Sequence, residues 1–526
     1  MKTKYFMAVA ILTILLCSCD RQTDSSESSN EFSVGQVIFS ADFSSDDEKA
    51  EWKFPENAAF IHDEALDKVR LDIKVEPSQK PGSVVAIYNI DLTPYKGMRL
   101  LFSCKMKADN VSRPGDSWNG CKFMLHIFSE SLGEQWINVN NLWGTFEWRE
   151  VRFSADIPKD VSPNAKIILG LQDSYGSISF ADIKVTILRV GRPEPPLNPP
   201  PAFKGHNLPR LRGAMAGTKI TPEDLRFFSK EWNGNLIRWQ FVRNWGVPDT
   251  DRDTVEYNNW LRGELDYLDK LIPYCKEYGI MLVLDMHSPP GGRYENNDIA
   301  MFYEPMYADL FVNNWKMLAE RYKGENIIWG FDLLNEPVQS EMPQEGEDYY
   351  LQLQKRAALA IRDIDPLRTI IFAADEWDSP HAFANLMPVD IKNVIYQVHM
   401  YWPHEYTHQG VGNSSTGLVY PSEKWNKEAL RKQLAPVREF QLAYNVHIYT
   451  GEFSVIRWAE GAGQYLSDCI ELFEEYGWDW SYHAFREWDG WSLEHGSDKN
   501  SSERTTETNP RKETVLKWFK QNIPAN

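Results

Sequence analysis

Residues 327–337 read Ile-Ile-Trp-Gly-Phe-Asp-Leu-Leu-Asn-Glu-Pro, an apolar run that turns polar at Asn335 and Glu336 and stops at Pro337. Similar runs recur through residues 202–526, separated by helix-like stretches. Apolar strands that alternate with helices favour a parallel sheet covered on both faces, and eight of them predict a (β/α)8 barrel. The eight runs are 211–217, 235–241, 280–287, 327–337, 369–377, 394–401, 446–454 and 479–485. The clearest helical patterns are 264–278, 310–322 and 349–364.

Polar side chains gather where these runs end. Active sites of such barrels lie at the carboxyl ends of the strands. Polar groups are costly to bury without partners, so these side chains are expected to converge on one cleft. They are Arg238, Asp285, His287, Asn335, Glu336, His399, Tyr401, Glu452, Arg486, Glu487 and Trp488.

Two lone carboxylates, Glu336 and Glu452, end the fourth and seventh runs, which lie roughly opposite each other in an eight-stranded barrel. Cleavage of a glycosidic bond requires such a pair: one carboxyl protonates the leaving oxygen, and the other stays ionised to attack the anomeric carbon. Arg238 is expected to keep the second carboxylate ionised. Taken alone, Glu336 is better explained as a helix cap, Arg238 as a structural ion pair and His399 as a core histidine. The two matched carboxylate motifs favour catalysis.

Five motifs in order, LIRWQF, LDMH, LLNEP, QVHMY and TGEF, make the second part of the chain resemble glycoside hydrolase family 5, the cellulase family. The resemblance implies that Glu336 is the general acid/base and Glu452 the nucleophile of a retaining enzyme. The remaining implied roles are substrate-binding or supporting: Asn335 bonds the sugar 2-hydroxyl, Arg238 and Tyr401 hold Glu452, His399 lies beside the acid, and His287 contacts the sugar or braces Arg238.

The family also has an aromatic residue at the end of strand eight, which forms the floor of the subsite. Here Phe485 lies where a strand-end tryptophan is expected, and Trp488 follows three residues later. We expect Trp488 to take this role. His404 and His408 are interpreted as part of a binding loop rather than as metal ligands. Neither a metal nor an organic cofactor is expected.

The implied function is hydrolysis of a polysaccharide, in the manner of an endo-β-1,4-glucanase. Two alternatives stay open. One is an exo-acting enzyme, or one directed at mannan or β-1,3-glucan. The other is a non-catalytic surface protein that binds polysaccharide on a decayed barrel, although the complete set of strand-end residues argues against it.

The first part, 32–190, alternates apolar and polar residues in about eight short runs, which predicts an antiparallel sandwich. It resembles the jelly-roll carbohydrate-binding modules of secreted glycosidases. The resemblance offers Asp42 and Asp182 as calcium ligands. Four tryptophans are interpreted either as platforms that stack on sugars or as residues of ordinary packing: Trp118, Trp136, Trp143 and Trp148.

Residues 1–18 resemble a lipoprotein signal peptide. An apolar core too short to span a bilayer precedes Leu16-Cys17-Ser18-Cys19, which is similar to a bacterial lipobox. The resemblance implies a lipidated Cys19; plain secretion with a free Cys19 is the alternative. Residues 19–31 are expected to be a flexible tether, 191–201 a proline-rich linker and 202–526 the hydrolase domain. The expected location is the bacterial cell envelope, at the outer membrane or cell surface.

Charge and cysteines limit the partners. The net charge of -19 excludes a nucleic-acid footprint. The expected partners are a polysaccharide and, through the lipid anchor only, a membrane; the protein is expected to be a monomer. Cys104 and Cys121 either pair across a hairpin or stay free, whereas Cys275 and Cys469 lie in helical patterns as buried thiols.

Overall fold

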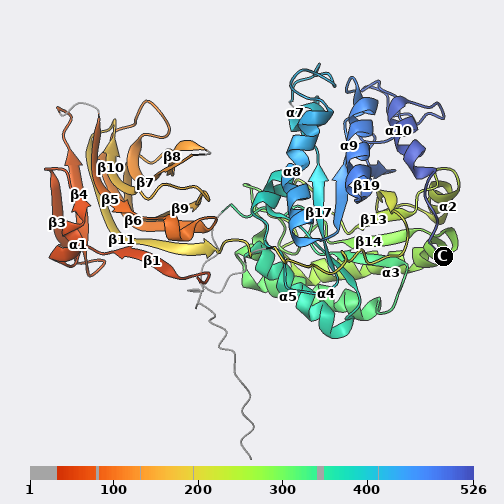
Figure 1. Ribbon diagram of the computed structural model, residues 1–526, viewed down its shortest axis with the longest axis horizontal. Coiled ribbons are helices and arrows are strands. Elements are labelled where there is room, and N and C mark those ends of the chain that lie inside the picture. The colour runs from red at the N-terminus through yellow and green to blue at the C-terminus, as the bar shows by residue number, and fades with distance from the viewer. Residues whose placement is uncertain are drawn as a thin grey trace, which may run out of the picture. The chain divides into compact units, whose positions relative to one another are not determined.

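The computed structural model describes residues 32–78, 82–130, 132–193, 195–340, 349–412 and 414–525. The chain divides into two compact units, and the division falls between Gly191 and Arg192 (Figure 1). The expected signal peptide, tether and lipidation site at Cys19 lie outside the described residues. Within the described ranges, no helix combines the length and apolar character needed to cross a membrane.

The first unit consists of two antiparallel sheets that enclose one apolar core (Figure 1). This confirms the predicted all-β character, whereas the jelly-roll connection pattern stays a prediction. The larger sheet contains β1 (Val37–Ala41), β3 (Ala58–Asp63), β4 (Lys68–Val75), β6 (Arg99–Val111), β9 (Gly144–Asp156) and β11 (Gly176–Arg189). The smaller contains β2 (Trp52–Lys53), β5 (Ser83–Ile90), β7 (Gly120–Ser129), β8 (Gly133–Asn138) and β10 (Ala165–Gln172). Two short helices accompany them, α1 (Asp46–Ala50) and η1 (Thr93–Tyr95).

Cys104 and Cys121 do not form a disulfide. Cys104 lies on β6 and Cys121 on β7, which belong to opposite sheets rather than to one hairpin. Both side chains are buried in the core between the sheets, and burial raises the pKa of the Cys121 thiol to about 12. The apolar surroundings therefore keep these cysteines as inert core residues.

Three of the four tryptophans proposed as sugar platforms lie at the surface. Trp118, Trp136 and Trp143 are exposed by 56%, 57% and 41%. Trp136 stacks on the ring of His126 at a centroid distance of 3.8 Å. Trp148 is partly buried and donates its indole N–H to Asp63 over 3.3 Å. Sugar binding by this unit stays a prediction.

The two aspartates proposed as calcium ligands are engaged with the protein itself. Asp42 accepts a hydrogen bond from the backbone N–H of Ser44 over 2.9 Å. Asp182 forms ion pairs with Lys68 and Lys105. The two lysines already supply the positive charge that a calcium ion would bring to Asp182.

The proline-rich segment 191–201 lies along the second unit rather than standing off as a free spacer. Arg192 donates to the carbonyl of Leu386 over 3.0 Å, and the Tyr444 hydroxyl donates to the carbonyl of Pro193 over 2.8 Å. Proline residues have no N–H group to donate within a proline-rich segment. The Pro193 carbonyl therefore accepts its hydrogen bond from a side chain of the barrel.

The second unit is a closed barrel of eight parallel strands, which confirms the predicted (β/α)8 fold. Each predicted run contains one strand. The strands are β12 (Arg212–Ala216), β13 (Leu236–Gln240), β14 (Met281–Asp285), β15 (Ile328–Asp332), β16 (Thr369–Phe372), β17 (Val394–Met400), β18 (Ile448–Phe453) and β19 (Asp479–Phe485). The α-helices are α2 (Pro222–Lys230), α3 (Thr254–Tyr278), α4 (Pro305–Arg321), α5 (Tyr350–Ile364), α6 (Asp375–Asp378), α7 (His404–Thr407), α8 (Lys427–Tyr444), α9 (Ala462–Tyr476) and α10 (Pro510–Phe519), with short η2 (Ala300–Phe302) and η3 (Pro380–Ala384).

Local signals explain the bounds of α3, which begins ten residues before the predicted helix (264 − 254). The side chain of Asp253 accepts hydrogen bonds from the N–H groups of Val255 and Glu256, which caps the amino end. Gly279 ends the helix at φ 66°, a left-handed conformation that costs glycine little.

Strand alternation places Arg238 inside the barrel. Successive side chains of a strand point to opposite faces. On β13, Trp239 points toward α3, where its ring lies 6.4 Å from that of Tyr267. Its neighbour Arg238 therefore points inward, where it is fully buried. A buried guanidinium requires partners, and the strand ends supply them.

Candidate active site

Arg238 is the centre of a buried network of charged groups. Its Nη1 lies 2.6 Å from Glu452 Oε1, and its Nε lies 2.8 Å from Asp332 Oδ2. Its Nη2 donates to Asn335 Oδ1 over 3.0 Å and lies 3.1 Å from Asp285 Oδ2. This one cation on β13 thus joins side chains from the ends of β14 and β15 and from β18 across the barrel.

The network contains more carboxylates than cations, so their charge states differ. Burial raises the pKa of Asp332 well above its usual range, and Asp285 adds to this effect against the pull of Arg238. Burial would also raise the pKa of Glu452, but His399, His483 and Arg238 lower it well below its usual range. A proton taken up by the network therefore goes to Asp332 before Glu452.

Glu452 is held at both carboxylate oxygens. Arg238 binds Oε1, and the Tyr401 hydroxyl donates to Oε2 over 2.8 Å. His483 Nδ1 lies 3.4 Å from the same Oε2. Burial raises the pKa of Tyr401 well above its usual range, so this hydroxyl stays a donor. The arrangement fixes an ionised carboxylate that points into the mouth of the barrel.

Glu336 lies in a left-handed backbone conformation, with φ 48°. Its strand, β15, ends at Asp332, so the polar pair follows a buried turn rather than ending the strand directly. Arg293 donates to the carbonyls of Asn335 and Glu336 over 3.1 and 2.8 Å, and Asp378 accepts the Glu336 N–H over 3.3 Å. These contacts offset a conformation that costs a non-glycine residue about 1–2 kcal/mol.

Asp378 reaches Glu336 from a second strained segment, which the sequence analysis did not identify as functional. Glu376, Trp377 and Asp378 follow β16 with φ values of 55°, 65° and 54°. The turn aims the Asp378 carboxylate inward, where it also accepts the N–H of Ala374 over 2.6 Å. Polar residues at the end of the fifth predicted run were the available signal.

One histidine joins the two carboxyl groups. His399 Nδ1 lies 2.9 Å from Glu336 Oε1 and 3.8 Å from Glu452 Oε2. One oxygen of Glu336 and one of Glu452 lie within 4.8 Å of each other. The two carboxylates therefore face the same small space, although they are 116 residues apart (452 − 336).

His287 braces the partners of Arg238. Its Nδ1 lies 2.8 Å from Asp285 Oδ2, and its Nε2 lies 3.3 Å from Asn335 Nδ2. The amide N–H of Asn335 can only donate, so Nε2 accepts and Nδ1–H donates to Asp285. Of its two predicted roles, the described contacts show the bracing one.

The aromatic residues after β19 take different positions. Phe485 is fully buried and packs on Phe228 and Trp232, at 5.0 and 5.1 Å, on the helix side of the barrel. Trp488 is 40% exposed, and its ring lies 5.4 Å from that of Trp491. Phe485 therefore cannot form a floor for the site, while the role of Trp488 stays a prediction.

The match to known families covers the barrel. A family model described as cellulase, glycosyl hydrolase family 5, matches residues 199–489. The chain belongs to glycosyl hydrolase family 5. This family 5 enzyme is a glycoside hydrolase, as the motifs predicted, and its cellulase-type β-glycosidase function follows from the same match.

Curated relatives share the barrel at moderate identity. Endoglucanase C of Acetivibrio thermocellus is 30% identical over 300 residues, which cover 50% of this chain and 84% of that protein. Cellodextrinase A of Ruminococcus flavefaciens is 26% identical over 306 residues, covering 54% and 86%. Among solved structures, endoglucanase Cel5A of Thermotoga maritima aligns with a TM-score of 0.43 at 24% identity, covering 54% of this chain and 91% of that one.

A small cleft of this family 5 enzyme is lined in part by aromatic side chains. A cavity of about 120 Å³ is lined by Trp245, His287 and Arg293, among others. The Arg293 guanidinium lies 5.3 Å from the Trp245 ring and 4.9 Å from the Trp377 ring. Both rings are exposed, by 47% and 38%, so they offer apolar surface around Arg293.

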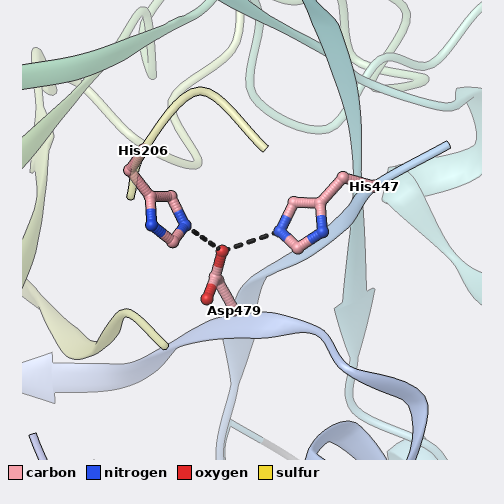
Figure 2. Close-up of side chains that lie close together, drawn as sticks. All are labelled: His206, His447 and Asp479. Carbon is pink, nitrogen blue, oxygen red and sulfur yellow. Dashed lines mark hydrogen bonds and ion pairs between the residues drawn. The ribbon is translucent and has the colours of Figure 1, made fainter. Parts of the chain in front are cut away.

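Two groups of three side chains in the described part of the enzyme place potential metal ligands together. One is Glu336, His399 and Glu452, where Arg238 already provides the positive charge beside Glu452. The other is His206, His447 and Asp479 at the amino ends of the strands (Figure 2).

Figure 2 shows two histidines, His206 and His447, hydrogen-bonded to the carboxylate of Asp479. We interpret this arrangement as a structural contact rather than a metal site. Both histidine Nε2 atoms lie 2.7 Å from the same oxygen of Asp479, closer than the roughly 3.3 Å between two ligands of one tetrahedral zinc. Leu211 donates its N–H to the other oxygen over 2.8 Å. Burial would raise the pKa of Asp479, but the two histidines lower it. These hydrogen bonds connect the segment before β12 to β18 and β19.

Proposed function

We propose that this family 5 enzyme is a retaining β-glycosidase that cleaves polysaccharide chains internally, as an endo-β-1,4-glucanase does. Glu336 acts as general acid/base and Glu452 as nucleophile. The observation that carries the proposal is the approach of the two carboxyl groups to within 4.8 Å. Retaining enzymes hold these groups about 5–5.5 Å apart, whereas inverting enzymes leave about 6.5–9.5 Å for a water molecule.

In the first step Glu452 attacks the anomeric carbon and forms an ester bond to the sugar. The glycosidic C–O bond breaks, and its oxygen takes the proton of Glu336. Arg238 and Tyr401 hold the attacking carboxylate ionised and oriented. Asn335, whose Oδ1 accepts from Arg238, bonds the 2-hydroxyl of the same sugar in this proposal.

In the second step Glu336, now ionised, removes a proton from water. The resulting oxygen nucleophile attacks the anomeric carbon, and the ester bond to Glu452 breaks. His399 is bonded to Glu336 and orients it for both proton transfers. Two inversions at one carbon leave the product with the starting configuration.

A β-glucan is the substrate that the comparisons support. Two of the relatives are named endoglucanase C and cellodextrinase A. The exposed rings of Trp245 and Trp377 lie around Arg293, which donates to the Glu336 carbonyl, and they offer stacking faces for the leaving part of the polysaccharide. A panel of β-1,4-glucan, β-1,3-glucan and mannan with product sizing tests linkage and endo mode together. Binding without hydrolysis of any of them would support the non-catalytic alternative.

Replacement of Glu336 by alanine tests the acid/base assignment. We expect polysaccharide hydrolysis to fall about 10²–10⁴-fold, because no group protonates the leaving oxygen. On an aryl glycoside whose leaving group needs no proton, the rate of the first step should fall less. Added azide should restore turnover and give the β-glycosyl azide, identified by NMR. An α-azide, or no rescue together with unchanged polysaccharide hydrolysis, would contradict the assignment.

We propose also that Cys19 carries a lipid that anchors the enzyme in the bacterial cell envelope. The support is the lipobox-like sequence at 16–19. We expect the full chain to partition with membranes and the Cys19→Ser variant to be soluble or retain its leader. Equal membrane association of both proteins would contradict the anchor.

A further inference from the structure

A third carboxylate reaches the nucleophile through a histidine. On β19, His483 Nδ1 lies 2.5 Å from the Tyr401 hydroxyl, and His483 Nε2 lies 3.0 Å from Glu487 Oε2. Tyr401 in turn donates to Glu452 Oε2. The strand-end motifs that carry the family resemblance include neither His483 nor Glu487.

One ordering of donors and acceptors satisfies all three of these contacts when Glu487 is ionised. Tyr401 uses its hydrogen to bond Glu452, so its oxygen accepts from His483 Nδ1–H. Glu487 is an acceptor when ionised, so His483 Nε2 also carries a hydrogen. A ring with both nitrogens protonated is an imidazolium.

We propose that Glu487 and His483 are positioning residues for the nucleophile: Glu487 keeps His483 as an imidazolium, and this cation holds Glu452 ionised and oriented through Tyr401. The inference rests on the proposed function of Glu452. It gives each oxygen of the nucleophile its own cation, because Arg238 binds Oε1 while the His483 chain acts on Oε2.

The charges agree with this arrangement. Burial would lower the pKa of His483, but Glu487 and Glu452 raise it to about 10. Burial would raise the pKa of Glu487, but His483 lowers it below its usual value. The Glu487 side chain is 29% exposed, so it is also in contact with solvent.

Other titratable groups face the same chain and bear on its pH dependence. Arg238 from β13 and His399 from β17 act directly on Glu452. His287 after β14 faces Glu487. His408 after α7 is repelled by His483, and burial lowers its pKa to about 3, so it stays neutral. Asp285, Asp332 and Glu336 also lie near the network.

The proposal predicts that two variants move opposite limbs of the pH profile of kcat/KM. His483→Gln removes a cation near Glu452, which raises the pKa of the nucleophile, so the acidic limb should move up by about 1 pH unit or more. Glu487→Gln lowers the pKa of His483, so the imidazolium is lost at lower pH. The acidic limb of the Glu487→Gln profile should stay in place. On the basic side, the activity of this variant should fall at a lower pH than that of the unaltered enzyme. NMR titration of the His483 ring should show the same lowered pKa.

His62→Gln is the matched control, because His62 forms an exposed pair with Asp67 at 3.4 Å in the other unit. Its profile should equal that of the unaltered enzyme. Glu487 lies near the surface, so its variant tests the proposal even where His483→Gln folds poorly. If neither variant moves a limb of the pH profile while Glu452→Gln is inactive, the positioning role of His483 and Glu487 is wrong and the proposed function stands. Full activity of Glu452→Gln would instead overturn the proposed function.

Discussion

Replacing Glu452 by glutamine should reduce turnover by about 10⁵-fold or more. The amide keeps the size of the side chain and accepts from Tyr401, but it cannot form the glycosyl ester. Initial rates on the best polysaccharide of the panel measure the loss. The fold should persist, since the change relieves a network in which Asp285, Asp332 and Glu452 share one buried cation.

Glu475→Gln provides the matched control for this experiment. Glu475 lies on α9, where it forms an exposed ion pair with Arg431 and takes no part in the network around Glu452. Its variant should keep the full rate, and all three proteins should show thermal unfolding midpoints within a few degrees. Turnover by Glu452→Gln close to that of the control would show that another group is the nucleophile.

Replacing Arg238 by methionine should cause the largest loss of stability. The change leaves three buried carboxylates without their shared cation, and breaking such a buried network costs about 3–5 kcal/mol of the free energy of unfolding. Urea unfolding at pH 7 measures it. Arg431→Met, which removes an exposed ion pair, should stay within about 1 kcal/mol of the unaltered protein.

The pH dependence of this loss has a defined sign. In the unaltered protein the pKa of Glu452 is lowered on folding, so its pairing stabilises the protein above the unfolded pKa and the stabilisation is lost as pH falls. In the variant the unpaired carboxylates acquire raised pKa values and destabilise the fold most at neutral pH. The two proteins should therefore converge in stability on acidification toward about pH 4. A gap that is constant with pH would contradict the electrostatic explanation.

The residues found from the sequence share one property: they follow an apolar run or alternate within it. Arg238, Glu452 and Tyr401 were identified as a group because strand periodicity and strand order decide which side chains point to the mouth of a barrel. The structure shows the three in direct contact. Helix α3 was found but began earlier, because its cap at Asp253 precedes the strongest apolar pattern.

The residues that were missed depend on conformations that a run of letters does not specify. Asp378 reaches Glu336 only because three successive residues adopt left-handed φ values, which side-chain identity does not predict. Asp332 and His483 lie within runs that were interpreted as buried strand, so neither was considered for the site. Phe485 was a candidate for the cleft until its contacts with Phe228 placed it on the helix side.

Residues 327–337 and TGEF, as the fourth and seventh of eight apolar runs, predicted two carboxylates on opposite strands of a barrel, because hydrophobic periodicity is a local property of the chain. Their approach to within 4.8 Å, and the opposite pKa shifts of Asp332 and Glu452, are decided by tertiary structure alone. Electrostatic interactions and proton transfer depend on distances and burial between residues that are far apart in sequence, and these are set only when the barrel closes.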